Sequence, residues 1–224
     1  MRNRPSLNLL APVFALSLLA AAPAQSCATA LLLAMDVSNS VDAGEYRLQV
    51  EGTAAALRDP QVIEGLTLGT GGAVAVMQWS GAGMQEMSIP WTRVSREGEV
   101  LALSGQVASM PRAFIGANTA LGDAMEQAIA AFGPVNECRR FIIDVSGDGS
   151  DNSGSDPAQA RRRAARSGIT VNALAIEGLG AAITRYYKEQ VITRDGFVET
   201  ARGFTDFARA IRDKMRRELS QVMF

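Results

Sequence analysis

The stretch LLLAMDVSNSVD (residues 31–42) decides the fold, because an apolar run ends abruptly in three oxygen-bearing side chains. Residues 29–35 are short and almost continuously apolar, which is typical of a strand buried on both faces. Asp36, Ser38 and Ser40 then follow at alternate positions. Side chains alternate along an extended turn, so we expect these three oxygens to converge on one point. We interpret the stretch as a strand followed by half of a cation site.

The N-terminus has the pattern of a signal peptide over residues 1–24. Two arginines precede a mostly apolar run at residues 9–22, and residues 22–24 (Ala-Pro-Ala) form a small-x-small cleavage pattern. A run of about 14 residues is shorter than the roughly 20 that a membrane span needs. We therefore expect a periplasmic or secreted protein, with residues 25–224 as one domain and no membrane span after cleavage. A lipoprotein anchored at Cys27 is the alternative.

The composition excludes several classes of protein. Lys and Arg total 22 and Asp and Glu total 23, for a formal net charge of −1, so the basic footprint of a nucleic-acid-binding protein is missing. The arginine-rich stretches at residues 160–166 and 212–219 are interpreted as solvated helix faces. The sequence contains no histidine, which excludes Ser-His-Asp and Cys-His hydrolases and imidazole-based zinc sites.

Strand and helix patterns alternate along the chain. Strands are expected over residues 29–35, 71–80, 84–94, 139–149, 169–176 and 197–200. Helices are expected over residues 42–58, 96–108, 156–168, 181–190 and 204–219, with another that begins near residue 119. Pro90 restricts the third strand to a sheet edge. The alternation predicts a doubly wound, Rossmann-like α/β fold, with a mostly parallel six-stranded sheet and one antiparallel edge strand.

The second half of the cation site is expected at the same edge of the sheet, because ligands bind at the carboxyl ends of parallel strands. Thr119 stands at the start of a helix, and Asp148 follows the fourth strand. Two carboxylates and three hydroxyls suit a hard divalent cation, so Mg²⁺ is the expected ion, with Mn²⁺ and Ca²⁺ as alternatives. The neutral hydroxyls leave the cation attractive to a further carboxylate. Asp144 and Asp151 add acids to which the sequence assigns no role.

These motifs resemble those of von Willebrand factor A (vWA) domains. DVSNS (residues 36–40) resembles their D-x-S-x-S motif, and ANTALGDAM (residues 117–125) is similar to the Thr-containing loop of bacterial members. The resemblance spans residues 28–218 and is closest to a group of exported bacterial single-domain proteins. It implies a metal-ion-dependent adhesion site (MIDAS) whose coordination a partner's Asp or Glu completes. The implied ligands are Asp36, Ser38, Ser40, Thr119 and Asp148. Ser146-Gly147 departs from the simpler pattern, and we expect it to widen the loop after the fourth strand.

The function predicted from these observations is non-enzymatic: an exported module that binds a protein partner through a divalent cation. A hydrolase that uses the same cation and a structural domain with a vestigial site are the alternatives. An EF-hand reading of residues 144–155 fails because Ser155 stands where a Glu is needed. A phosphotransferase with an Asp nucleophile fails because it needs a second Asp at the position of Ser38.

Cys27 and Cys138 are predicted to form a disulfide. Cys27 lies nine residues before Asp36, and Cys138 lies ten before Asp148. If the two aspartates lie level on neighbouring strands, the two cysteines meet at the opposite edge of the sheet. Strands about 4.8 Å apart place Cα atoms within the roughly 4.4–6.8 Å of a disulfide, and export provides an oxidising compartment.

Overall fold

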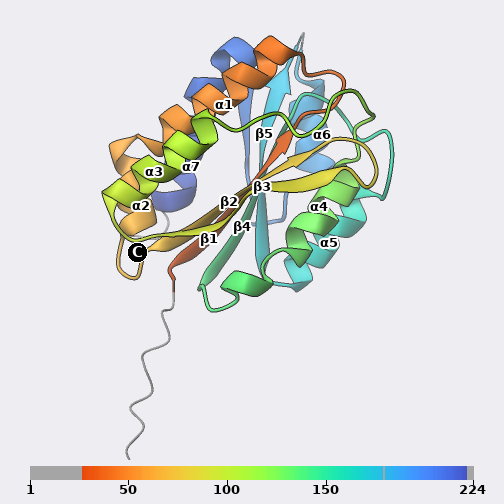
Figure 1. The fold of residues 1–224 in the computed structure, drawn as a ribbon. Helices are drawn as coiled ribbons and strands as arrows, with labels where there is room; N and C mark the ends of the chain where they lie inside the picture. Colours follow the sequence, from red (N-terminus) through yellow and green to blue (C-terminus); the bar gives the residue numbers. More distant parts are fainter. Residues whose placement is uncertain (1–26, 179, 221–224) are drawn as a thin grey trace, which may run out of the picture.

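The computed structural model describes residues 27–178 and 180–220, so the predicted signal peptide lies outside the described residues. Within these ranges six strands form one sheet in the order β3-β2-β1-β4-β5-β6 (Figure 1). The strands are β1 (Thr29–Asp36), β2 (Gly72–Trp79), β3 (Gln85–Val94), β4 (Arg140–Gly147), β5 (Ile169–Glu177) and β6 (Val198–Arg202). No helix in the described ranges combines the length and the apolar character needed to cross a membrane.

The sheet has the predicted mixed topology. β1, β2, β4, β5 and β6 pair in parallel, whereas β3 pairs antiparallel with β2 at the edge of the sheet. Pro90 lies in this edge strand, where a missing backbone donor is tolerated. The predicted doubly wound α/β fold with one antiparallel edge strand is confirmed.

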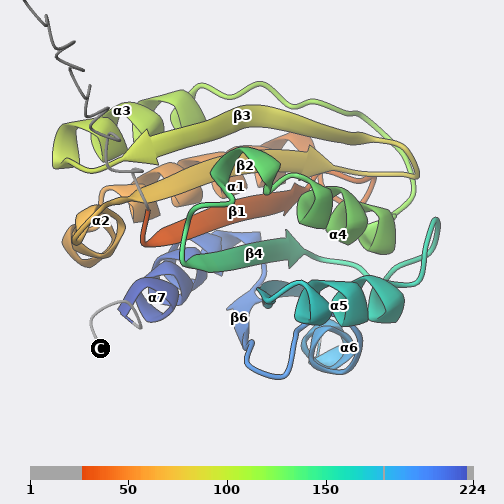
Figure 2. The same cartoon turned by 90° about the horizontal axis from the view of Figure 1, so that it is seen from below.

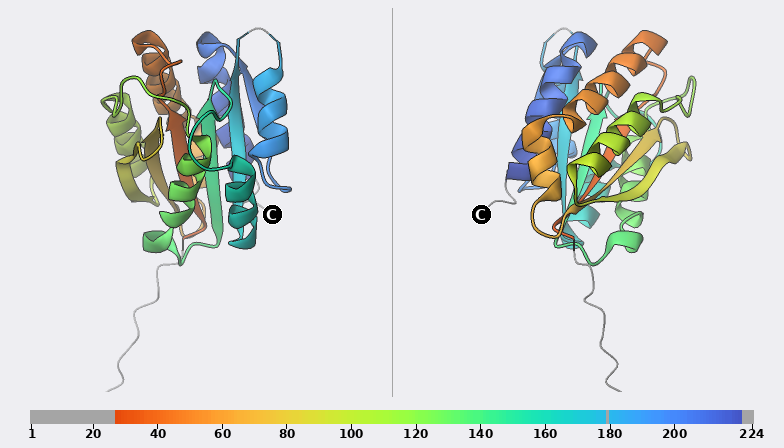
Figure 3. Two further views of the ribbon diagram at one scale, coloured as in Figure 1. Left: turned by 90° about the vertical axis from the view of Figure 1, so that its right-hand side faces the viewer. Right: turned by 60° about the vertical axis from the view of Figure 1, so that its left-hand side comes forward.

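Helices cover both faces of the sheet (Figures 2 and 3). The helices are α1 (Ala43–Leu57), α2 (Pro60–Thr67), α3 (Glu97–Ala108), α4 (Leu121–Ala130), α5 (Pro157–Arg166), α6 (Ala182–Gln190) and α7 (Phe207–Ser220). Helices α1, α2, α3 and α7 pack on one face, and α4, α5 and α6 on the other. Leu31 and Leu33 of β1 face the first core, and Leu32 faces the second. Because both faces of β1 are buried, its sequence is apolar without the polar alternation of a half-exposed strand.

Helix caps decide where several helices begin. Asp42 accepts a hydrogen bond from the Glu45 backbone N–H (2.8 Å), and the Glu45 side chain accepts one from the Asp42 N–H (2.8 Å), which is a capping box. Helix α2 was not predicted from the sequence. Its N-cap, Asp59, accepts from the Gln61 N–H (3.0 Å), and Pro60 occupies the first turn. This Asp-Pro signal is the same one that correctly predicted the start of α5.

The predicted disulfide between Cys27 and Cys138 is present, with the two Cα atoms 4.4 Å apart. The register of β1 and β4 pairs Thr29 with Arg140, so the cysteines stand opposite each other two residues before these positions. The bond uses the Cys27 sulfur that the lipoprotein alternative would need. It closes the amino-terminal end of the two central strands, at the edge opposite the predicted cation site.

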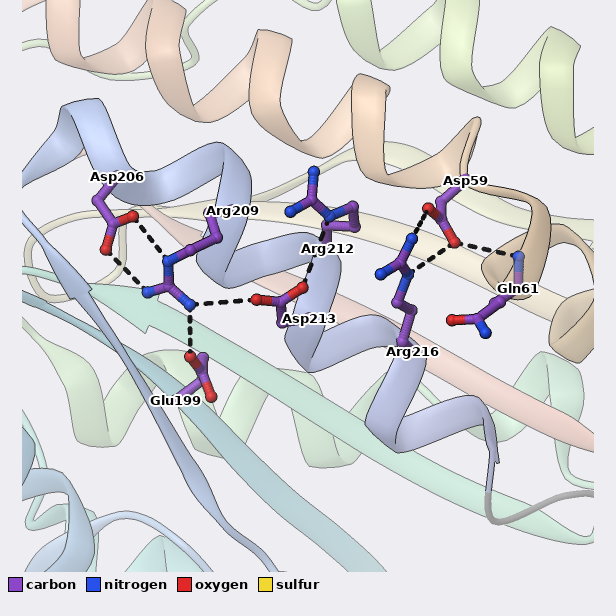
Figure 4. Close-up of polar contacts among 8 residues, drawn as sticks. All are labelled: Asp59, Gln61, Glu199, Asp206, Arg209, Arg212, Asp213 and Arg216. Atoms are coloured by element: carbon purple, nitrogen blue, oxygen red, sulfur yellow. Dashed lines mark hydrogen bonds and ion pairs between the residues drawn. The ribbon is translucent and has the colours of Figure 1, made fainter.

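Helix α7 carries a row of ion pairs on its exposed side (Figure 4). Arg209 contacts Glu199, Asp206 and Asp213. Nearer the end of the helix, Arg216 Nε donates to Asp59 Oδ1 (2.9 Å) and so connects α7 to the start of α2. Exposed pairs of this kind each contribute at most about 1 kcal/mol.

Candidate metal centre

The carboxyl ends of β1 and β4 bring the predicted ligands to one place. Asp36 is the last residue of β1. The strand register pairs Met35 with Ser146, so Asp36 is level with Gly147, and Asp148 follows one residue beyond. Thr119 lies two residues before Leu121, the first residue of α4, at the same edge of the sheet.

The turn after β1 directs its side chains toward a common centre. The Ser38 backbone N–H donates to Asp36 Oδ1 (2.8 Å), which fixes one side of the carboxylate. The Val41 N–H donates to the Ser38 carbonyl (3.1 Å) and closes the turn. Because Asp42 caps α1, the hydroxyls of Ser38 and Ser40 are not needed as helix caps.

The structure brings all five predicted ligands together. The Ser38 and Ser40 hydroxyl oxygens are 3.3 Å apart, and Thr119 Oγ1 donates to Ser38 Oγ (3.4 Å). Ser40 Oγ donates to Asp148 Oδ1 (2.6 Å), a contact that spans 108 positions of sequence. The cluster therefore combines two carboxylates with three hydroxyls from three separate segments of the chain.

Asp36, like Ser38, has none of its surface exposed. Burial raises the pKa of its carboxyl group from 3.8 to about 7, against the hydrogen bonds from Ser38 that lower it. Its second oxygen, Oδ2, has no hydrogen-bond partner among the described residues. A divalent cation would supply the missing partner, and a donor set made only of oxygens suits Mg²⁺. The residues present therefore fit such an ion.

Gly147 is required by the crowding behind the cluster. A Cβ atom at this position would lie 2.8 Å from Asp36 Oδ2 and 2.5 Å from the hydroxyl of Tyr187. The expectation that Ser146-Gly147 widens the loop after the fourth strand is wrong, because both residues continue β4. The glycine keeps space beside the carboxylate that a side chain would fill.

Two residues that the sequence analysis missed hold the site loops in place. Arg112 donates through Nη2 to the carbonyl oxygens of Val37 (2.9 Å), Ser38 (3.1 Å) and Val41 (2.8 Å). Asn152 exchanges two hydrogen bonds with the backbone of Thr119, at 2.8 and 3.0 Å. The sequence gives no signal for Arg112, since its targets are backbone groups more than 70 positions away.

The two additional acids take no part in the cluster. Asp151 Oδ1 accepts a hydrogen bond from the Gly122 N–H (3.2 Å) in the first turn of α4, an ordinary role for an acid at a helix start. Asp144 lies in the interior of β4, beneath α7, and contacts Lys214. Neither supplies the extra ligand that would favour Ca²⁺ over Mg²⁺.

Solved structures of similar fold come from adhesive and bacterial proteins. Proximal thread matrix protein 1 of the mussel byssus, in a structure with a zinc-occupied MIDAS motif, gives a TM-score of 0.64 at 17% identity, over 87% of this chain and 46% of that one. The von Willebrand factor type A protein of Catenulispora acidiphila gives 0.59 at 17% identity, over 88% and 43%. The pilus adhesin SpaC of Lactobacillus rhamnosus GG gives 0.60 at 16% identity, over 89% and 31%.

These likenesses establish a vWA fold. The chain spans less than half the length of each of these three proteins. A family profile described as "Protein of unknown function (DUF1194)" matches residues 26–223. No curated protein sequence matches the chain.

Proposed function

This chain belongs to the family described as "Protein of unknown function (DUF1194)", and from its vWA fold and its oxygen cluster we propose that it is an exported, non-enzymatic module that binds a protein partner through a divalent cation. The cation is Mg²⁺, held by the five clustered residues. The partner contributes an Asp or Glu to the open side of the ion. The module acts in the periplasm or outside the cell.

The observation that carries this proposal is the unpartnered, fully buried Oδ2 of Asp36. A buried carboxylate oxygen without a hydrogen bond is costly unless a cation compensates it. Arg112 contributes positive charge to the surroundings of Asp36, but it donates its hydrogen bonds to backbone carbonyls. An external divalent ion is the simplest source of the missing charge. The zinc-occupied MIDAS of the mussel protein supports this assignment.

The exposure of the ligands gives the direction from which a partner approaches. Asp36, Ser38 and Thr119 are buried, whereas Ser40 is exposed and Asp148 is half-buried. A cation held by these residues would therefore be accessible from the side of Ser40 and Asp148. Three of the five ligands are neutral hydroxyls, so the bound ion retains attraction for an incoming carboxylate.

An apolar contact lies beside this opening. Ile115 is 86% exposed in the loop between α3 and α4. The same loop is fastened to the cation-binding turn, because the Asn39 N–H donates to the Ala117 carbonyl (3.1 Å). Ile115 therefore borders the metal site on a fixed loop, where a partner that places an acid on the cation would cover it.

A capture experiment tests the proposal. Immobilised mature protein is exposed to cell-envelope extract with Mg²⁺ or with chelator, alongside Asp36→Asn and Ile115→Ser. We expect one partner to be retained with Mg²⁺, lost with chelator and with Asp36→Asn, and weakened by Ile115→Ser. Glu51→Gln, on the exposed face of α1, is the matched control and should behave as wild type. A partner that remains bound to Asp36→Asn would contradict the proposal.

The non-enzymatic assignment is tested separately. The Mg²⁺-loaded protein is incubated with peptide, ester and phosphoester substrates. We expect no turnover above that of Asp36→Asn. Turnover that disappears in this variant would instead support the hydrolase alternative.

A further inference from the structure

A second group of buried charges lies between α7 and the sheet, separate from the cation-binding cluster. Lys214 and Glu218 extend from one face of α7, and Asp144 extends from β4. Lys214 is 0% exposed, Glu218 1% and Asp144 2%. The Lys214 Nζ atom lies 2.5 Å from Asp144 Oδ1 and 2.6 Å from Glu218 Oε1. An amine and two carboxyl groups are thus in direct contact, away from solvent.

The two carboxyl groups are held differently. Lys214 donates a hydrogen bond to Glu218 (2.6 Å), which also accepts one from Asn172 Nδ2 (2.8 Å). Asn172 is fixed in turn by the Phe197 backbone N–H (3.0 Å). Asp144 Oδ1 contacts the same Nζ atom (2.5 Å). The amine of Lys214 therefore lies between the two carboxyl groups and touches both.

The surroundings favour the protonated form of Asp144. Burial of one carboxylate beside another is costly, and the charge of Arg140 acts on Glu218. Burial, together with the charge of Glu218, raises the pKa of Asp144 to about 7. The ring of Phe197, with its centroid 5.7 Å from Lys214 Nζ, adds an apolar wall. Transfer of one proton from the Lys214 ammonium group to the Asp144 carboxylate across their 2.5 Å contact would give an amine beside a carboxyl group, which is the reactant pair for amide formation.

We propose that Lys214 and Asp144 join in an intramolecular isopeptide bond, with Glu218 as the proton relay. The Nζ lone pair attacks Cγ of the protonated Asp144 carboxyl group, and a C–N bond forms. Glu218 takes a proton from the nitrogen and delivers it to the leaving hydroxyl group. The C–O bond then breaks, one water molecule leaves, and Glu218 returns to its carboxylate form. Contact distance removes most of the entropic barrier, and the step needs no oxidant or co-reactant.

The bond would tie the C-terminal helix covalently to a central strand. Asp144 lies in β4, the strand that leads into Asp148. Together with the disulfide at the other end of the sheet, it would give an exported protein two covalent cross-links, one a disulfide and one an amide. The proposal does not depend on the cation or on a partner.

Peptide mass spectrometry tests this inference on the wild-type protein. Purified protein, verified as folded by circular dichroism, is denatured, reduced and digested with trypsin. We expect residues 141–161 linked to residues 213–216, at the sum of the two peptide masses less one water molecule. Cleavage after Lys214 should be blocked, because its amine is consumed. Free 141–161 peptide as the main product from folded protein would overturn the proposal.

Three variants separate the roles of the residues. Lys214→Arg and Glu218→Gln should abolish the linked peptide. Asp144→Asn should retain the link, with loss of ammonia in place of water. A link from Lys214 to the peptide that begins at Glu218 would show that Glu218 is the acyl partner and would refute the assignment of Asp144. Because the wild-type digest alone decides whether the bond exists, a variant that fails to fold does not obscure the result.

Discussion

Two buried aspartates, Asp36 at the end of β1 and Asp144 within β4, differ in the source of their counter-charge. Asp36 is 0% exposed and Asp144 2%, and burial raises the pKa of each to about 7. Asp144 forms an ion pair with Lys214 (2.5 Å), whereas Asp36 has no ion pair among the described residues and is influenced by Arg112 only through its charge. A buried acid that pairs with a positive charge of the chain contributes to the structure. A buried acid without such a pair is a candidate ligand for an external cation.

The largest expected change in stability comes from the buried ion pair of Asp144 and Lys214. Lys214→Met removes the amine between two buried carboxyl groups, and breaking a buried pair in this way costs about 3–5 kcal/mol. We expect the free energy of unfolding, measured by urea denaturation, to fall by that amount. Lys188→Met on the exposed side of α6 is the matched control and should change it by less than about 0.5 kcal/mol. Equal effects of the two substitutions would show that the buried amine has no structural role.

An intermediate effect is expected from Asp36, and it depends on pH. In chelator, folded protein keeps the Asp36 proton up to a pKa of about 7, whereas the unfolded chain releases it near the ordinary value of 3.8. The stability that this proton provides is therefore complete at low pH and is lost as the pH rises from about 4 to about 7. Asp36→Asn lacks this loss, so at pH 8 it should be more stable than wild type by about 4 kcal/mol, since the pKa shift spans roughly three units at ~1.4 kcal/mol per unit.

Urea denaturation of both proteins between pH 4 and pH 8, without divalent cations, measures this difference. The two stability curves should converge near pH 4 and separate toward pH 8. Saturating Mg²⁺ should stabilise the wild type but not Asp36→Asn, and so remove or reverse the difference at pH 8. Parallel curves across the whole range would mean that Asp36 is not an uncompensated buried acid.

The smallest effect is expected for Asp59, a buried acid that is already paired with an arginine whose side chain is exposed. The hydrogen bond from Arg216 lowers the pKa of Asp59, so the stability from this pair exists above the unfolded pKa and is lost as the pH falls. Asp59→Asn keeps a helix-capping side chain but removes the charge. Since the Arg216 side chain is 39% exposed, we expect a loss below about 1 kcal/mol at pH 7 and none at pH 2. A loss as large as that of Lys214→Met would contradict the distinction between exposed and buried pairs.

The same comparison explains what could be predicted from the sequence. Asp36, Ser38 and Ser40 lie within five positions, and their alternation after an apolar strand was sufficient to locate half of the site. The disulfide could be predicted because each cysteine lies a similar number of residues before an aspartate, and the two aspartates lie at one edge of a parallel sheet. Both predictions depend on the spacing of residues along the sequence and on the regular geometry of strands.

The parts that could not be predicted depend on contacts between distant segments. Lys214 contacts Asp144 only because α7 packs against the sheet. The residues next to Lys214 in the sequence do not indicate that this lysine is fully buried. Arg112 binds backbone carbonyl groups. Every residue has such a group, so the sequence does not indicate which residues Arg112 binds. Helix α2 differs, because its Asp59-Pro60 start was visible and was missed in a segment of only eight helical residues.

Calorimetric titration of the mature protein with Mg²⁺ tests the central claim, that the cluster around Asp36 is a cation site. Wild type and Asp144→Asn should bind the ion with the same affinity, because Asp144 takes no part in the cluster. Asp36→Asn and Asp148→Asn should show no binding heat. At about 100 times the dissociation constant, Mg²⁺ should also stabilise the wild type by about 2.7 kcal/mol. Equal affinity in all four proteins would contradict the account, since the ion would then bind elsewhere.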